Sequence, residues 1–421
     1  MTQAVDVFTP NSFPTFTYVE RRRESLEGVL TNALKVKNAL ISLSGPSKSG
    51  KTVLINKIIP RDNLIYIAGA SIKAPGDLWR VILSWAGGPV EVVNTKNGTI
   101  GGSAGASAEL KVGIPLVAKG GGAVEVGVEG SWSAGSSRQI AFDGLSSVAK
   151  EIAGTDFIVF IDDFHYINRE VQAEVAKEVK AGAESGIRFC IASVPHRADD
   201  VVRGNGELRG RLHAVDTDYW DVEELSQIAR QGFRELKAIL DESIIARLAK
   251  EAFGSPQLMQ AMCLNLAVAK GLSQSLPEPS DVDVSEVDLR QTFELTSAGA
   301  NYQSLLESLH SGPRQRGTER KEFDLIDDSK GDVYRATLLA IRTDPGQLSF
   351  TYDEMQRRVR SVCKSEVPAG GSITRSLEQM DEIADMHQPK AIEWLDDVLD
   401  VVDPYFLFYL RASRKFEKLG G

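Results

Sequence analysis

The sequence predicts an α/β protein in which a parallel sheet flanked by helices is followed by a mostly helical second half. Short apolar runs alternate with amphipathic helical segments up to about residue 216, a pattern typical of a parallel sheet with crossover helices. A glycine-rich loop separates the first of these runs from the helix after it. From Asp221 onward the apolar residues recur at helical spacing.

Strands and helices of the first half follow from this alternation. Five strands are predicted, at residues 39–44, 63–68, 156–162, 187–193 and 212–216. Such near-continuous apolar runs are buried on both faces of a sheet, so we expect helices on both sides. The helices are predicted at residues 20–34, 53–59, 75–85 and 168–180.

Length and composition bound the class of protein. A chain of 421 residues exceeds what one hydrophobic core usually supports, so we expect two or three domains. The net charge of −10 argues against a nucleic-acid footprint over the whole surface, although a local basic patch stays open. Neither a basic and apolar leader nor a spanning run stands out, so we expect a cytoplasmic protein away from membranes. The cysteines Cys190, Cys263 and Cys363 lack paired spacing and are expected to be buried thiols.

The glycine-rich loop carries the strongest chemical signal. Its residues are Gly45, Pro46, Ser47, Lys48, Ser49, Gly50, Lys51 and Thr52. They match G-x-x-x-x-G-K-[ST], the P-loop, in which backbone N–H groups and a helix N-terminus surround phosphates. Lys51 is expected to contact the β- and γ-phosphates, and the Thr52 hydroxyl is expected to bind Mg²⁺. The sequence therefore predicts that the chain binds ATP and Mg²⁺.

Polar residues at strand ends complete the predicted site. Asp162 and Asp163 follow a buried strand and should emerge at the carboxyl edge, where such sheets bind ligands. We expect Asp162 to hold Mg²⁺ through water and Asp163 to orient or deprotonate the attacking water. Ser193 ends the fourth strand at the same edge, suited to contact the γ-phosphate, although a helix cap is the alternative.

Three arginines and two histidines lie near the predicted site in the sequence. Arg203, Arg209 and Arg211 precede the fifth strand, from where an arginine could reach the γ-phosphate of a neighbouring subunit. His165 and His196 lack any nearby nucleophile pattern or metal-ligand spacing, so we interpret both as structural.

With these motifs, residues 18 to 417 resemble the AAA+ superfamily, in the branch shared by signal-transduction ATPases with numerous domains (STAND) and archaeal origin-recognition initiators. Tyr18 to Arg21 resembles the motif that touches adenine there, which implies base contacts for Val19 and Arg21. Ser193 falls at the sensor position, and Gly254-Ser255-Pro256 resembles the lid motif with its proline near the base. The lid arginine of other AAA+ proteins is missing around residues 254–260, so slow hydrolysis is expected.

The resemblance extends to domain organisation. It implies an ATPase core over residues 1–220, a helical lid over 221–285, and linker helices with a winged-helix domain over 286–421. Helices are expected at residues 334–341, 351–363 and 373–386, with wing strands within 391–402 and a closing helix after Asp403-Pro404. The presumed recognition helix carries Glu378, Asp381, Glu382 and Asp385 against Arg375. Because acids are repelled by phosphate, a protein partner is favoured over DNA.

A glycine-rich insertion at residues 94–137 departs from the family pattern. Apolar residues alternate at 110–116 and again at 124–128, around the turn Lys119-Gly-Gly-Gly122, which predicts a β-hairpin. A lone hairpin is marginal in water, so its apolar face needs a partner. Packing on its own domain, self-association, and a surface that senses another protein or a membrane all stay open, as does a pore-forming stem.

These features are compatible with three functions. The first is a nucleotide-dependent switch that oligomerises and signals to a partner or effector protein, with bacterial defence as the context that the STAND resemblance implies. The second is a DNA-binding ATPase resembling replication initiators or transposition regulators, with Arg357, Arg358 and Arg360 on phosphate. The third is a nucleotide-binding scaffold with negligible turnover, for which Asp163→Ala would change no rate.

Overall fold

The computed structural model describes residues 1–21, 26–36, 40–86, 144–194, 212–314, 320–387 and 390–419. Three predictions lie outside these ranges: the hairpin within residues 94–137, the role of the arginines Arg203, Arg209 and Arg211, and the structural assignment of His196.

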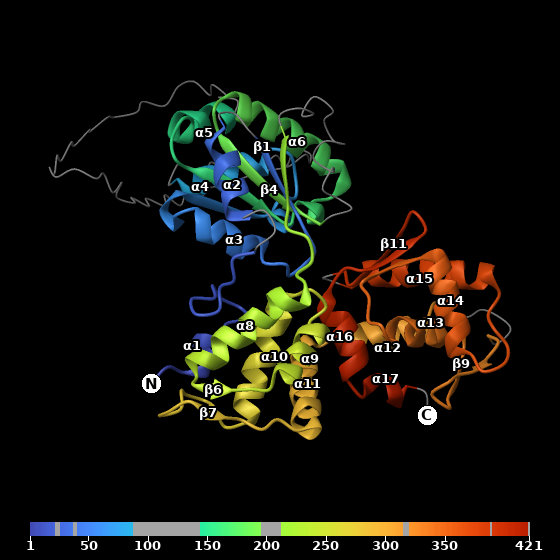
Figure 1. The fold of residues 1–421 in the computed structure, drawn as a ribbon. Coiled ribbons are helices and arrows are strands. Elements are labelled where there is room, and N and C mark those ends of the chain that lie inside the picture. The colour runs from blue at the N-terminus through green and yellow to red at the C-terminus, as the bar shows by residue number, and fades with distance from the viewer. Residues whose placement is uncertain are drawn as a thin grey trace, which may run out of the picture.

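A five-stranded parallel sheet forms the first body of the molecule (Figure 1). Its strands are β1 (Leu40–Ser44), β2 (Leu64–Ala68), β3 (Ile158–Asp162), β4 (Arg188–Ser193) and β5 (Leu212–Asp216). They are arranged in the order β2-β3-β4-β1-β5, and each neighbouring pair is parallel. All five carboxyl ends therefore meet at one edge, which confirms the predicted fold class of a parallel sheet flanked by helices.

Helices cover both faces of this sheet. They are α2 (Leu26–Lys35), α3 (Lys51–Ile58), α4 (Asp77–Trp85), α5 (Gly144–Ile152) and α6 (Arg169–Glu184). Apolar residues of α4, α5 and α6 pack in one cluster with the strands, and those of α2 and α3 pack in the other. Short 3-10 turns occur at η1 (Arg61–Asn63), η2 (Gly69–Ser71) and η3 (Phe164–Tyr166).

The prediction of a helix from Glu20 was wrong in its first part, because α2 begins at Leu26 and residues 18–21 are not helical. The physical reason is a tether: the Arg21 guanidinium donates to the carbonyl oxygens of Asp218 and Tyr219, 3.2 and 3.0 Å away. These bonds hold Arg21 in a non-helical conformation.

A helical body follows the sheet, made of α8 (Val222–Glu235), α9 (Glu242–Glu251), α10 (Pro256–Ala269) and α11 (Glu286–Ala300). A capping box is present at the start of α8, between Asp221 and Glu224. The segment between α10 and α11 packs on this body through the strand pair β6 (Ala238–Ile239) and β7 (Ser280–Asp281). Its apolar residues Leu276, Val282 and Val284 contact the same core, which explains why it is ordered.

The N-terminal segment packs with the helical body, although it precedes the sheet in the chain (Figure 1). Short helix α1 (Ala4–Val7) contributes to the core of this body, and Phe8 lies against Phe233 with ring centroids 5.0 Å apart.

The C-terminal body has its own core. Its elements are α12 (Gln303–Ser311), β8 (Phe323–Asp324), β9 (Lys330–Gly331), α13 (Val333–Arg342), β10 (Ser349–Thr351), α14 (Tyr352–Val362), α15 (Gly370–Asp385), β11 (Ile392–Leu395), β12 (Val398–Val401), α16 (Pro404–Ala412) and α17 (Lys415–Lys418). The three predicted helices, the hairpin β11–β12 and the closing helix are all present, and β10 joins the hairpin in the order β10-β12-β11.

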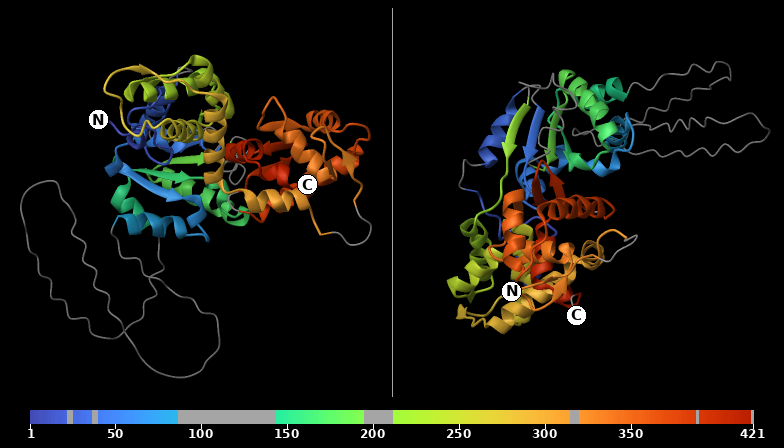
Figure 2. Two further views of the ribbon diagram at one scale, coloured as in Figure 1. Left: turned by 90° about the horizontal axis from the view of Figure 1, so that it is seen from below. Right: turned by 90° about the vertical axis from the view of Figure 1, so that its right-hand side faces the viewer.

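Helix α16 links the C-terminal body to the helical body, and Figures 1 and 2 show it between the two. Phe406, Leu407 and Leu410 belong to the C-terminal core, whereas Phe408 belongs to the core of the helical body. Arg411 adds an ion pair to Glu251 of α9, at 3.3 Å. Within the described ranges, no helix is long and apolar enough to cross a membrane.

Candidate nucleotide site

The loop of residues 45–52 joins β1 to α3 at the carboxyl edge of the sheet. Gly50 has a φ of 94°, which favours glycine, and it directly precedes the first residue of α3. At Gly45 an added Cβ would lie 1.7 Å from the Thr217 hydroxyl, so no side chain fits there. Strand, loop and helix thus form the context in which a P-loop surrounds phosphate.

Lys51 is buried at the base of this loop. Its ammonium donates to the carbonyl oxygens of Gly45 and Pro46, each at 2.8 Å. Burial lowers the pKa of Lys51, and the nearby carboxylates of Asp163 and Asp162 oppose that shift. The loop backbone therefore holds the Lys51 ammonium close to where the predicted phosphates would bind.

The Thr52 hydroxyl donates to Oδ2 of Asp162 at 2.7 Å, which brings the two predicted Mg²⁺ ligands together. A hydroxyl oxygen and a carboxylate are ligands that Mg²⁺ prefers, and the ion usually completes its shell with waters and substrate phosphates. No group of three or more His, Cys, Asp or Glu that could hold a metal occurs among the described residues. The pair fits a magnesium ion that depends on phosphate for its remaining ligands.

Asp163 follows Asp162 in a left-handed conformation, with a φ of 54°. Gly69 packs so closely on it that a Cβ there would lie 2.4 Å from the Asp163 carbonyl oxygen. Burial and the neighbouring Asp162 charge raise the pKa of Asp163, while Lys51 and Lys48 oppose that shift. Asp163 is among the residues that line the cavity beside the loop.

Ser193 ends β4, which lies between β1 and β3. It is aligned with Ser44 in the sheet, and its carbonyl oxygen accepts a hydrogen bond from the N–H of Gly45 at 3.1 Å. Ser193 is 1% exposed and is not among the residues that line the cavity beside the loop. Its predicted contact with a γ-phosphate stays a prediction.

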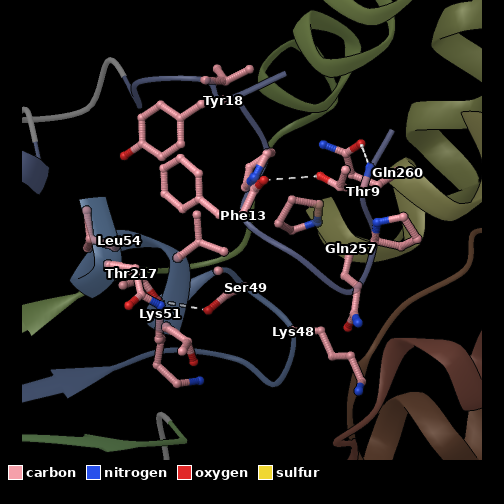
Figure 3. Close-up of a pocket in the computed structure, with 18 of the residues that line it drawn as sticks. Thr9, Phe13, Tyr18, Lys48, Ser49, Lys51, Leu54, Thr217, Gln257 and Gln260 are labelled. Carbon is pink, nitrogen blue, oxygen red and sulfur yellow. Dashed lines mark hydrogen bonds between the residues drawn. The ribbon is translucent and has the colours of Figure 1, made fainter. Parts of the chain in front are cut away.

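A cavity of about 650 Å³ extends from the loop to the N-terminal segment and α10 (Figure 3). The rings of Phe13 and Tyr18 stack on its far side, with centroids 5.9 Å apart and planes 12° apart. The Tyr18 hydroxyl donates to Glu27 at 2.6 Å, and Lys57 lies over the Tyr18 ring. Predicted base contacts Val19 and Pro256 also line this cavity.

Arg21 lines the same cavity, but its guanidinium is already engaged. Besides the two carbonyl oxygens described above, it forms an ion pair with Glu224 at 3.4 Å and lies 5.3 Å from the centre of the Trp220 ring. The predicted adenine contact remains a prediction, and the observed partners make Arg21 a link between the N-terminal segment and the start of α8.

Residues that sequence reasoning missed also hold the loop. Trp220 donates from its indole Nε1 to the carbonyl oxygen of Ser49 at 2.8 Å, and the Thr217 hydroxyl lies 3.0 Å from that of Ser49. Both follow β5, whose carboxyl end meets the same edge. The sequence signal for these two residues is their position directly after the predicted strand at 212–216, which is not part of the P-loop motif.

Lys48 extends away from the cavity floor toward the C-terminal body (Figure 3). Its ammonium lies 5.6 Å from the ring centre of Tyr405 in the first turn of α16. The Lys48 carbonyl accepts from the Ser255 hydroxyl at the start of α10, at 3.4 Å. One loop residue therefore contacts both other bodies.

Sheet order and the loop between β1 and α3 define the arrangement of a P-loop nucleotide-binding fold, to which the helical body is added. Solved structures similar to the chain include a Walker-type ATPase of Pyrococcus abyssi, with 14% identity, 93% of this chain and 97% of that chain covered, and a TM-score of 0.48. The ORC2 protein of Aeropyrum pernix has 12% identity, coverage of 98% and 97%, and a TM-score of 0.48. Cdc6p from Pyrobaculum aerophilum has 12% identity, 99% of each chain covered, and a TM-score of 0.43.

No family model and no curated protein matches the sequence.

Proposed function

We propose that the chain binds ATP with Mg²⁺ and hydrolyses it slowly, as a molecular switch. The observation that carries the proposal is the pairing of Thr52 with Asp162 at 2.7 Å, beside a P-loop whose Lys51 is buried against the loop carbonyls. A simple flexible turn would require neither a buried ammonium nor a carboxylate from another strand at the start of its helix.

Each polar group has a role in this proposal. Backbone N–H groups of residues 45–52 and the start of α3 bind the β- and γ-phosphates, and Lys51 neutralises their charge. Thr52 and Asp162 hold Mg²⁺, which neutralises developing charge on the phosphate oxygens. Asp163 orients or deprotonates the attacking water, a task for which its raised pKa suits it.

Slow turnover is proposed because positive charge near the γ-phosphate is limited. The first turn of α10, from Pro256, carries no arginine. An arginine supplied by a neighbouring subunit is worth a factor of about 10³ to 10⁵ in hydrolysis rate. Arg209 and Arg211 are our candidates for that role, with Ser193 as the sensor, so fast hydrolysis would require an oligomer.

The switch would act through contacts that converge on the loop. Trp220 and Ser255 reach it from the helical body, and Tyr405 reaches it from the C-terminal body. A phosphate that changes the loop conformation would act on all three contacts, so nucleotide state would bias how the bodies are held. Homo-oligomerisation, signalling to a partner or effector protein, and a bacterial defence context complete this proposal.

DNA binding through a winged helix is the alternative, and side chains of the C-terminal body argue against it. Glu378, Glu382 and Asp385 are exposed on α15, and Lys390 forms an ion pair with Asp385 at 2.7 Å. Arg358 is engaged with the carbonyl oxygens of Thr343 and Pro345 and lies over Phe350. An acidic face and an occupied arginine favour a protein partner over phosphate.

Mass photometry of the purified protein tests the proposal, with ADP, with ATP and Mg²⁺, and with duplex DNA, alongside ATP hydrolysis measurements. Lys51→Ala is the control variant. Assembly or slow hydrolysis with ATP that Lys51→Ala abolishes is the expected result. A protein that ignores ATP but binds duplex DNA in a salt-dependent manner would overturn the switch and favour the DNA-binding alternative.

A further inference from the structure

Tyr66 stands beside the proposed magnesium ligands, although no motif includes it. It lies on β2, the edge strand of the sheet, where it is aligned with Phe160 of β3. Its hydroxyl donates to Oδ2 of Asp162 at 3.3 Å, the same oxygen that accepts from Thr52 at 2.7 Å. Two hydroxyl groups from different elements therefore converge on one carboxylate oxygen.

We propose that Tyr66 is a positioning residue for the metal site: its hydroxyl holds the Asp162 carboxylate in the orientation that receives Mg²⁺. This inference rests on the proposed function. Residues that hydrogen-bond to metal ligands fix their orientation, and their loss usually weakens metal affinity or activity by about 10- to 100-fold.

The chemistry of the two donors supports separate roles. A threonine hydroxyl has one proton and two lone pairs, so Thr52 can donate to Asp162 and still offer a lone pair to Mg²⁺. Tyr66 has no such second task here. A tyrosine hydroxyl keeps its proton at neutral pH, so Tyr66 remains a donor to Asp162.

The Tyr66 ring is packed on one neighbouring ring and is otherwise half-exposed. Tyr66 is 50% exposed, and its ring packs on Phe160 with centroids 5.9 Å apart. Replacement by phenylalanine retains this packing and removes only the hydroxyl, so Tyr66→Phe is expected to fold normally. An effect of this variant on metal binding can therefore be assigned to the hydrogen bond.

The experiment measures binding of a fluorescent ADP analogue as free Mg²⁺ is varied, with a parallel measurement in excess EDTA. For Tyr66→Phe we expect the Mg²⁺ midpoint to rise about tenfold, with unchanged affinity in EDTA. Tyr352→Phe is the matched control, since its hydroxyl accepts from Gln356 in the C-terminal body. A role in general stability would weaken binding in EDTA as well.

A double-mutant cycle with Asp162→Asn completes the test. If Tyr66 acts through Asp162, adding Tyr66→Phe to Asp162→Asn leaves the Mg²⁺ midpoint where the single Asp162→Asn variant has it. An unchanged midpoint in Tyr66→Phe, with Mg²⁺-dependent binding by the unaltered protein, overturns this inference alone. Absence of nucleotide binding by the unaltered protein overturns the proposed function together with it.

Discussion

The hydrogen bond from Trp220 to the P-loop offers a quantitative test of how the helical body supports the site. The Ser49 carbonyl that accepts this bond at 2.8 Å belongs to the same planar peptide as the N–H of Gly50. Fixing the carbonyl toward Trp220 therefore turns the Gly50 N–H in the opposite direction, into the loop. Trp220→Phe removes the donor but keeps a ring beside Arg21.

A net hydrogen bond between neutral groups contributes about 1 kcal/mol, and the freed carbonyl borders a cavity from which water can reach it. One kcal/mol of lost preorganisation corresponds to about a fivefold weaker affinity. We expect that loss for ATP and for ADP alike, measured by isothermal titration calorimetry.

Trp85→Phe is the matched control, because Trp85 is 42% exposed and packs on Phe157 away from the loop. Equal affinities for the unaltered protein, Trp85→Phe and Trp220→Phe would refute the reasoning, since the loop would then be ordered without its contact to the helical body.

Four further predictions concern the site and the bodies around it. Asp163→Asn is expected to slow single-turnover ATP hydrolysis by about 10²- to 10⁴-fold while ATP affinity is retained; equal rates would favour a scaffold. Gly45→Ala places a Cβ 1.7 Å from the Thr217 hydroxyl, so a loss of about 1 to 3 kcal/mol in urea unfolding is expected, and Thr217→Ala should restore part of it. Tyr405→Leu removes the ring near Lys48, worth about 1 kcal/mol, so amide exchange in the first turn of α16 should become faster than in Tyr405→Phe. Burial and the charge of Arg335 lower the pKa of His310, so the unfolded chain binds a proton at this imidazole more readily than the folded chain as the pH falls below about 6.5. The free energy of unfolding therefore decreases as the pH falls. His310→Gln should make the melting temperature less dependent on pH in thermal melts.

Much of the fold could be predicted because local signals agreed with burial. The five strands are short runs with apolar residues on both faces, and capping boxes at Asp221 and Thr351 mark helix starts directly. These signals depend on neighbours along the chain. Where a distant contact decides the conformation, as Arg21 does before α2, the sequence pattern misled.

Some residues of the candidate site could likewise be predicted from the sequence, and others could not. Thr52 and Asp162 could be brought together from the sequence, because strand order and carboxyl edges follow general rules. Tyr66, Trp220 and Tyr405 could not, since each reaches the site by a side-chain direction that no spacing encodes. For Arg21, a sequence motif suggested a contact with the base. In the structure its guanidinium instead binds two backbone carbonyl oxygens and the carboxylate of Glu224.

The packing of the first residues on the helical body divides the cavity between two bodies. Phe8 anchors that segment in the core of the helical body, and the same segment carries Phe13 and Tyr18. The sheet, in contrast, carries the P-loop. A nucleotide spanning the cavity would therefore contact the helical body through its nucleobase and the sheet through its phosphates. Such a nucleotide would connect the two bodies. Loss of the terminal phosphate would weaken its contacts with the sheet and leave its contacts with the N-terminal segment unchanged.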